Sequence, residues 1–438
     1  MTMKRVLLLT LIPLLLVGGC GRKNPVEEIS PEKSNVKVVD VAVDETKLLW
    51  PAWRGPQRDG VVPDQPLLTH WGEEENVLWR TEVPGRGHSS PIVVADSIYL
   101  ATAIQDQQKQ QVLAFDRATG ESKWTADVHT GGFPSERAVH HKATHANGTL
   151  ACDGVRLYTA FLNNDAIIAS ALDLDGNIVW QREIGKFVSK FGYAPSPVLY
   201  KSLVIFAADN MGGGYLAAVD GETGEIAWRV ARGTISSYSS PTIASVGGRD
   251  QLLISGCDAV ASFDPASGEK LWSTPGTAEA TCGTVITSKN RIFASGGYPD
   301  KETVCLSADG EKIWSVRTKV YEPSLVLNDG HLFAVSDDGV AYCWNADTGD
   351  VVWRERLGGK FSASPIVCND VIYVSNLNGE TFVFKNKNNS FKLISTNKLG
   401  DDAYASPAVA DSQMFMRVGV DKGSKRHEQL VCLESETP

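Results

Sequence analysis

The stretch between Trp124 and Asn147 gathers the side chains most able to do chemistry, four histidines: His129, His140, His141 and His145. Imidazole serves as a zinc ligand and as a general base, and a helix would bring His141 and His145 onto one face. The acidic residue of a zinc-protease motif is missing, and a predicted strand follows directly. We therefore predict a solvated loop without a metal. His140 and His141 stay candidate loop residues, because long loops on rigid scaffolds often carry function.

Cysteines offer a second chemistry, but their positions argue against it. Besides Cys20 the chain has seven, with no adjacent pair and no CxxC or CxxCH motif. Their spacing defines neither a disulfide framework nor a haem attachment. Cys305, Cys343 and Cys432 occupy one repeat position that is alanine or serine in other copies, so we expect small packed residues there and no catalytic thiol.

A glycine followed four residues later by a tryptophan recurs through the chain. The pattern occurs six times, at Gly120–Trp124, Gly176–Trp180, Gly224–Trp228, Gly268–Trp272, Gly310–Trp314 and Gly349–Trp353. The surrounding motifs also match, as in LAFDRATGESKW, LAAVDGETGEIAW and AYCWNADTGDVVW. Successive tryptophans lie 39 to 56 residues apart, which is close to the length of propeller blades and solenoid units.

Alternating apolar residues and short turns predict four strands in each unit, such as SSPIVVADS, SIYLATA, QQVLAFD and ESKWTADV. First strands recur eight times, but the last unit stops after its third strand, QLVCLE. The segment NVLWRTEV, residues 76–83, carries Trp79 and has no unit of its own. Pairing these two segments closes an all-β, eight-bladed β-propeller of four-stranded blades without a free sheet edge. An open solenoid would leave Trp79 without a blade.

The tryptophans of the repeat end the predicted fourth strands. A large ring there fills the gap between adjacent blades, and one ring per blade indicates packing rather than a ligand site. We predict structural roles for Trp79, Trp124, Trp180, Trp228, Trp272, Trp314 and Trp353. The seventh unit carries Leu393 at this position.

The first strand of each blade lines the channel of a propeller, so residues just ahead of it surround the channel mouth. Three residues before the Ser-Pro position of each blade, the sequence has His88, His145, Ala194, Tyr238, Ala280, Val320, Ser362 and Tyr404. His88, His145, Tyr238 and Tyr404 form a candidate ligand ring. The same side chains would also satisfy channel waters, and both interpretations stay open.

These motifs resemble the repeat of the PQQ-like β-propeller family, Ala-Leu-Asp-x-x-Thr-Gly-x-x-x-Trp, over about residues 76–435. The resemblance implies one of two functional branches. The quinoprotein alcohol dehydrogenases hold pyrroloquinoline quinone (PQQ) and calcium at the channel mouth of an eight-bladed propeller. The outer-membrane assembly lipoproteins of the BamB type are anchored propellers without cofactor or catalysis.

The dehydrogenase branch implies residues that are not found in this sequence. Its quinone lies between a floor tryptophan and a disulfide of adjacent cysteines, and the chain has no adjacent cysteines. Apart from the blade tryptophans and Trp344, only Trp50, Trp53 and Trp71 remain. No convergent carboxylates suit calcium. We expect no cofactor and assign no catalytic residue, with PQQ and calcium as the alternative.

The N-terminal residues indicate export to the cell envelope. Lys4 and Arg5 precede an apolar run that is too short to span a bilayer, and LVGGC resembles a bacterial lipobox, which implies lipidation of Cys20 at the end of a signal peptide, residues 1–20. Residues 21–49 predict a flexible tether. Residues 50–75, which include WPAWRGPQRDG, predict a cap in which Trp50 and Trp53 cover apolar blade ends. The propeller spans residues 76–435, and a tail spans 436–438.

The net charge of −10 disfavours nucleic acid as a partner. We predict a monomeric propeller that is lipid-anchored at the periplasmic side of the outer membrane. It would bind envelope proteins or polymers through its face loops, without catalysis, and touch the membrane only by its anchor. The alternative is a PQQ-dependent dehydrogenase that oxidises an alcohol or sugar at the channel mouth.

Overall fold

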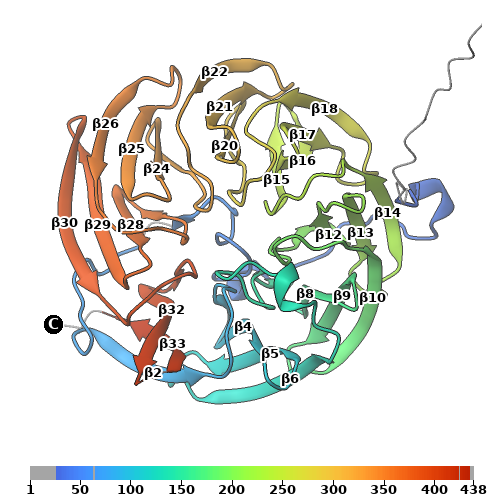
Figure 1. Ribbon diagram of the computed structural model, residues 1–438, viewed down its shortest axis with the longest axis horizontal. Coiled ribbons are helices and arrows are strands. Elements are labelled where there is room, and N and C mark those ends of the chain that lie inside the picture. The colour runs from blue at the N-terminus through green and yellow to red at the C-terminus, as the bar shows by residue number, and fades with distance from the viewer. Residues whose placement is uncertain (1–25, 63–64, 424, 435–438) are drawn as a thin grey trace, which may run out of the picture.

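The computed structural model describes residues 26–62, 65–423 and 425–434, and these fold into a ring of eight blades around a central channel (Figure 1). Each blade is an antiparallel sheet of four strands, so the predicted eight-bladed β-propeller is confirmed. The helices of the described residues are three 3₁₀ turns: η1 (Pro31–Lys33), η2 (Glu45–Lys47) and η3 (Glu136–Ala138). None of them is long or apolar enough to cross a membrane.

The blades follow one another in chain order, and each runs from the channel to the rim. Blades 1 to 4 consist of β3 (Ile92–Val94), β4 (Ser97–Ile104), β5 (Lys109–Asp116) and β6 (Ser122–Thr130); β7 (Ala151–Cys152), β8 (Arg156–Asn163), β9 (Ala166–Asp173) and β10 (Ile178–Lys186); β11 (Val198–Tyr200), β12 (Leu203–Ala208), β13 (Tyr215–Asp220) and β14 (Ile226–Ala231); and β15 (Thr242–Val246), β16 (Arg249–Gly256), β17 (Ala259–Phe263) and β18 (Lys270–Pro275). Blades 5 to 7 consist of β19 (Ile286–Ser288), β20 (Arg291–Gly296), β21 (Glu302–Ser307) and β22 (Lys312–Val316); β23 (Val326–Asn328), β24 (His331–Val335), β25 (Val340–Asn345) and β26 (Val351–Arg356); and β27 (Ile366–Cys368), β28 (Val371–Ser375), β29 (Glu380–Lys387) and β30 (Ser390–Lys398).

Blade 8 joins the two ends of the propeller. It contains β31 (Ala408–Ala410), β32 (Gln413–Lys422) and β33 (Lys425–Leu433), and its outer strand is β2 (Val77–Val83). β2 runs antiparallel to β33 with Val77 opposite Leu433 and Val83 opposite Glu428. Figure 1 shows the blue β2 beside the red strands of this blade. The predicted closure by N- and C-terminal strands is confirmed, and the open solenoid is excluded.

Each fourth-strand tryptophan packs against a turn of the following blade. Trp124 Nε1 donates a 2.9 Å hydrogen bond to the Leu174 carbonyl, and its indole lies under Gly176, whose φ is +89°. A Cβ atom on this glycine would come within 2.7 Å of the indole, so glycine suits both the backbone angle and the space. The same donation to a main-chain carbonyl of the next blade is made by Trp79, Trp180, Trp228, Trp272 and Trp314, whereas Trp353 donates to the side-chain oxygen of Asn386. The glycine of each repeat therefore receives the indole of the preceding blade.

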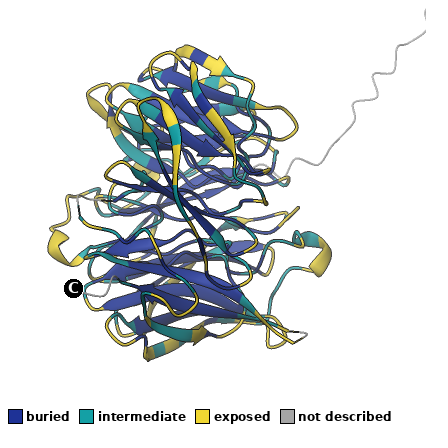
Figure 2. Cartoon of the chain, turned by 90° about the vertical axis from the view of Figure 1, so that its left-hand side faces the viewer, coloured by how far each residue is buried: buried dark blue, intermediate teal, exposed yellow. Residues whose placement is uncertain are grey.

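The apolar core lies between neighbouring blades rather than at the centre of the ring. Figure 2 shows buried strands inside the blades and exposed residues at their turns. The largest cluster of buried side chains joins blades 7, 8 and 1 and includes Trp50 and Trp71 from the N-terminal segment. The segment before β2 is thus part of the packed body.

Residues 26–49 lie along blades 3, 2 and 1, where the composition predicts a free tether. Ile29 forms a bridge with Arg229, the Ser202 N–H donates to the Val39 carbonyl, and the Ala95 N–H donates to the Lys47 carbonyl. These backbone bonds hold the segment at the surface of the ring. A charged composition did not reveal them, because the paired groups belong to the main chain.

Residues 50–62 plug one end of the channel. Trp50 forms a bridge with Val93 in blade 1, and the Pro51 carbonyl accepts from Cys152 N–H in blade 2. β1 (Val61–Val62) then pairs in parallel with β27 of blade 7. In Figure 1 the blue chain passes behind the centre of the ring. The segment expected to cap blade ends therefore ties several blades together from inside the channel.

Candidate functional site

A single ring of eight positions surrounds the channel mouth, and strand pairing corrects the predicted register in part of it. Ile92 pairs with Tyr99 in blade 1 and Ala151 pairs with Tyr158 in blade 2, which aligns His88 with Asn147 rather than with His145. The same comparison gives the ring as His88, Asn147, Ala194, Tyr238, Cys282, Glu322, Ser362 and Tyr404. Blades 2, 5 and 6 lack the Ser-Pro pair of the other blades, so counting from that pair misplaced them by two residues.

All eight ring residues line one cavity of about 820 Å³ at the channel mouth. The loops that join successive blades and the turns between second and third strands surround its entrance. Trp53 of the plug also lines the cavity. This volume lies within the roughly 300–1,000 Å³ typical of small-ligand sites. The three predicted residues His88, Tyr238 and Tyr404 meet here, and Cys282 and Glu322 are ring members that the sequence did not reveal.

A girdle of hydroxyl groups lies two residues beyond the ring. It consists of Ser90, Thr149, Ser196, Ser240, Thr284, Ser324, Ser364 and Ser406, which we call the hydroxyl girdle. In seven places a girdle oxygen accepts the backbone N–H of the girdle residue in the preceding blade, over 2.8–3.0 Å. At Thr284 the oxygen accepts from Trp53 Nε1 instead, at 2.9 Å. The plug thus completes the girdle.

His88 and Tyr404 form one wall of the cavity. Their rings are stacked with centroids 4.3 Å apart, and the Arg426 guanidinium lies 6.0 Å from the tyrosine ring. Burial lowers the pKa of His88 well below 6.5, and the positive charges of Arg86 and Arg417 lower it further. The imidazole is therefore neutral at pH 7 and contributes an apolar face to the wall.

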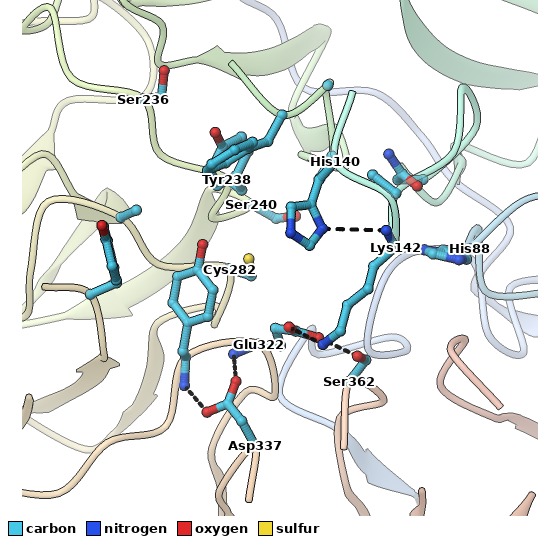
Figure 3. Close-up of a pocket in the computed structure, with 18 of the residues that line it drawn as sticks. His88, His140, Lys142, Ser236, Tyr238, Ser240, Cys282, Glu322, Asp337 and Ser362 are labelled. Carbon is cyan, nitrogen blue, oxygen red and sulfur yellow. Dashed lines mark hydrogen bonds and ion pairs between the residues drawn. The ribbon is translucent and has the colours of Figure 1, made fainter. Parts of the chain in front are cut away.

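An ion pair spans the mouth between opposite sides of the ring. Lys142, in the loop before blade 2, places Nζ 2.7 Å from Glu322 Oε1, just ahead of blade 6 (Figure 3). Ser362 donates a hydrogen bond to the other oxygen of the same carboxylate. Burial lowers the pKa of Lys142, but the hydrogen bond and charge of Glu322 outweigh it and raise the pKa overall. The two charges therefore neutralise each other in an ion pair.

Asp337 is the second carboxylate on this side of the cavity, and its oxygens also bind protein groups. Its oxygens accept the backbone N–H groups of Tyr321 at 2.9 Å and Glu322 at 3.0 Å. Burial raises the pKa of Asp337, and these hydrogen bonds oppose the rise. The carboxylate fixes the loop that presents Glu322, so it is a positioning group.

The loop does not bring His145 to the other histidines. His140 lines the cavity, and the exposed His141 contacts the His140 ring, with centroids 4.1 Å apart. His145 packs on Phe133 beside a separate small cavity, and burial lowers its pKa to about 4. Within the described residues, no three His, Cys, Asp or Glu side chains gather closely enough to hold a metal ion. His141 and His145 are four residues apart, but this stretch is a loop, so no helix brings their rings onto one face.

The cavity residues do not fit a quinone with calcium. Calcium takes six to eight oxygen ligands, whereas Glu322 and Asp337 already bind an ammonium group and backbone N–H groups. Trp53 offers an indole in the cavity, but Cys282 has no adjacent cysteine to form the other half of a sandwich. Burial also raises the pKa of the Cys282 thiol, so it is not an activated nucleophile.

The family model described as outer membrane protein assembly factor BamB matches residues 59–186, 137–305 and 299–390. The chain is 23% identical over 257 residues to the outer membrane protein assembly factor BamB of Francisella tularensis, covering 48% of this chain and 55% of that protein. It is 27% identical over 145 residues to methanol dehydrogenase (cytochrome c) subunit 1 of Methylorubrum extorquens, covering 29% of this chain and 23% of that protein. The chain therefore spans about half the length of the first relative and about a quarter of the second.

Solved structures share the fold. BamB from Moraxella catarrhalis superposes with a TM-score of 0.59 at 14% identity, covering 83% of this chain and 98% of that one. A europium-containing methanol dehydrogenase superposes with a TM-score of 0.67 at 11% identity, covering 88% and 98%. Identities this low establish the propeller architecture alone.

Proposed function

This chain belongs to the family described as outer membrane protein assembly factor BamB, and on that premise we propose that it is a non-catalytic binding module of the cell envelope. The observation that carries the proposal is the state of four titratable groups at the mouth, which either bind other protein groups or carry no charge. Lys142 and Glu322 bind each other, Asp337 binds backbone N–H groups, and His88 is neutral. Such a cavity offers shape and hydrogen bonds to a ligand, rather than a poised acid, base or nucleophile.

The proposed anchor is Cys20, which lies outside the described residues. Since residues 26–49 dock on blades 3, 2 and 1, only the few residues between Cys20 and Val26 separate the lipid from the ring. Five residues lie between Cys20 and Val26, and the six Cα–Cα steps that join these two residues span at most about 21 Å. We propose that the propeller is held close to the periplasmic side of the outer membrane, as a monomer, with envelope proteins or polymers as partners of its face loops.

Co-purification from detergent-solubilised envelope tests the binding role. The mature protein is expected to retain envelope components, and a Tyr238→Ala chain with an altered cavity wall is expected to retain less. An Ile178→Ala chain, changed on an exposed outer strand, serves as the matched control. Equal retention by all three chains would contradict binding at the mouth.

Membrane release tests the anchor separately. Cys20→Ser is expected to move the protein into the soluble fraction without changing its melting temperature. Metabolic labelling with a fatty acid that is incorporated equally into the variant would contradict lipidation at this cysteine.

A further inference from the structure

The hydroxyl groups of the girdle are hydrogen-bond donors for which no described residue is the acceptor. Each of its eight oxygens accepts one N–H, from a neighbouring blade or from Trp53, and none donates a hydrogen bond to another described residue. A hydroxyl donates as well as accepts, so the base of the cavity presents converging O–H donors. Six of the eight girdle residues line the cavity. A ligand that complements them carries several hydrogen-bond acceptors.

The charges of the cavity cancel. Four lysines and four acidic residues line it, and they include the ion pairs Lys142–Glu322 and Lys360–Asp338. The ammonium groups of Lys190 and Lys319 lie 5.2 and 5.9 Å from the rings of Phe191 and Tyr321. Burying a charged ligand against balanced charges leaves its desolvation uncompensated. The cavity therefore favours an uncharged ligand.

The walls add flat apolar surface to these donors. Tyr238 and Tyr321 line the cavity opposite the stacked His88 and Tyr404, and Trp53 lies at the girdle (Figure 3 labels His88 and Tyr238). Burial raises the pKa of Tyr238, so its hydroxyl stays protonated. An aromatic ring packs well against another ring that presents C–H groups on the facing side. An extended peptide finds no row of free N–H groups at the girdle, because girdle oxygens already accept the backbone N–H groups of neighbouring girdle residues in seven places.

We propose that the cavity binds an uncharged, acceptor-rich ligand, namely the glycosyl units of an envelope polymer. Sugar rings present hydroxyl and ring oxygens along their edges and C–H groups on their faces. The edges match the O–H donors of the girdle, and the faces match the aromatic walls. This inference rests on the proposed binding function and assigns a ligand class to it.

Cys282 supplies a reporter for the test because this partly exposed residue lines the cavity. Burial raises the pKa of its thiol and slows alkylation, so the mature protein is treated with iodoacetamide at pH 9 for hours, and modification of the peptide that contains Cys282 is followed by mass spectrometry. N,N′,N″-Triacetylchitotriose (chitotriose below) and maltotriose are uncharged, and each is expected to slow this reaction at least about fivefold. Inorganic phosphate and trialanine at equal concentration are not expected to slow it. Cys257 is also partly exposed but does not line the cavity, so its rate is the internal reference.

Variants of the girdle sharpen the test. Ser240→Ala and Ser364→Ala each remove one donor to the ligand, together with the acceptor of the Ser196 or Ser324 N–H, and each is expected to weaken protection by chitotriose by about 2- to 10-fold. Ser390→Ala, on an exposed strand end, is the matched control, and melting temperatures identify any variant that fails to fold.

Two outcomes overturn the ligand class: no protection by chitotriose or maltotriose, or protection by phosphate or trialanine alone. If sugars fail while envelope components still co-purify with the wild type and not with Tyr238→Ala, the binding function stands and only the ligand class is wrong.

Discussion

The two ends of the channel are built from the same first strands but use them in opposite ways. At the plugged end, Arg54 is 3% exposed and donates to the carbonyls of Asp59, Leu325 and Pro365 at 2.5, 2.6 and 3.4 Å. At the mouth, Lys142 and Glu322 meet at 2.7 Å over a cavity and stay partly exposed. The plug therefore joins blades through buried main-chain groups, whereas the mouth joins them through side chains that a ligand is able to approach.

Truncation should have the largest effect, because it removes first the plug and then the closing strand. A chain lacking residues 1–75 should fold but melt lower than the full chain, since the buried Trp50 and Trp71 are lost. A chain lacking residues 1–84 also loses β2 and Trp79, which exposes the edge of β33 and opens an interblade gap costing roughly 3–5 kcal/mol before strand pairing is counted. Thermal melts of both chains compare them, and equal melting temperatures would contradict closure by β2.

A matched pair of substitutions separates the two ends. Arg54→Met leaves three buried carbonyls without their donor, and we expect it to lower the free energy of unfolding by about 2–4 kcal/mol. Lys142→Met breaks a pair whose side chains are 33% and 22% exposed, and we expect a loss below about 1 kcal/mol. Denaturant unfolding measures both. Similar losses at the two ends would remove the contrast.

Low pH should lower the stability of the fold through His88, which lies in the cavity wall. Its pKa is lowered in the folded protein, so below pH 6.5 the unfolded chain takes up a proton that the folded chain refuses. Stability is therefore present above pH 6.5 and falls as the pH drops below it, by up to about 1.4 kcal/mol per pH unit. His88→Phe should reduce this slope without removing it, because the pKa of His129 is also lowered by burial, to about 4. Melting temperatures between pH 7.5 and 5 test this, and an unchanged slope would refute it.

The contact between plug and girdle should give a small effect. Trp53→Phe keeps one aromatic ring but removes the five-membered ring of the indole, with the N–H that donates to Thr284 Oγ1 at 2.9 Å. One neutral hydrogen bond contributes about 1 kcal/mol, and denaturant unfolding resolves that difference. A loss as large as that of Arg54→Met would mean that Trp53 holds the plug by more than this bond.

The repeat made the eight-bladed propeller predictable from the sequence, whereas the cavity depends on contacts between residues that are distant in the sequence. Gly176 and Trp180 report the blade geometry locally, because each glycine turn must accommodate an indole from the preceding blade. Glu322 gave no such signal: its partner Lys142 is 180 residues away and its blade lacks the Ser-Pro pair. Residues 323–324 read Pro-Ser instead of Ser-Pro. Aligning this unit by the strand that follows, rather than by its proline, would have placed Glu322 at the channel mouth. The docking of residues 26–49 was equally hidden, since main-chain hydrogen bonds carry it.

We propose that this propeller binds through its mouth and does not work as a quinoprotein. To test this proposal, the purified mature protein is incubated with PQQ and calcium, free quinone is removed, and quinone absorbance and dye reduction with alcohols and sugars are recorded. We expect no retained quinone and no dye reduction, because Glu322 and Asp337 already bind other protein groups and Cys282 has no adjacent cysteine. Stoichiometric quinone with substrate-dependent dye reduction would contradict it.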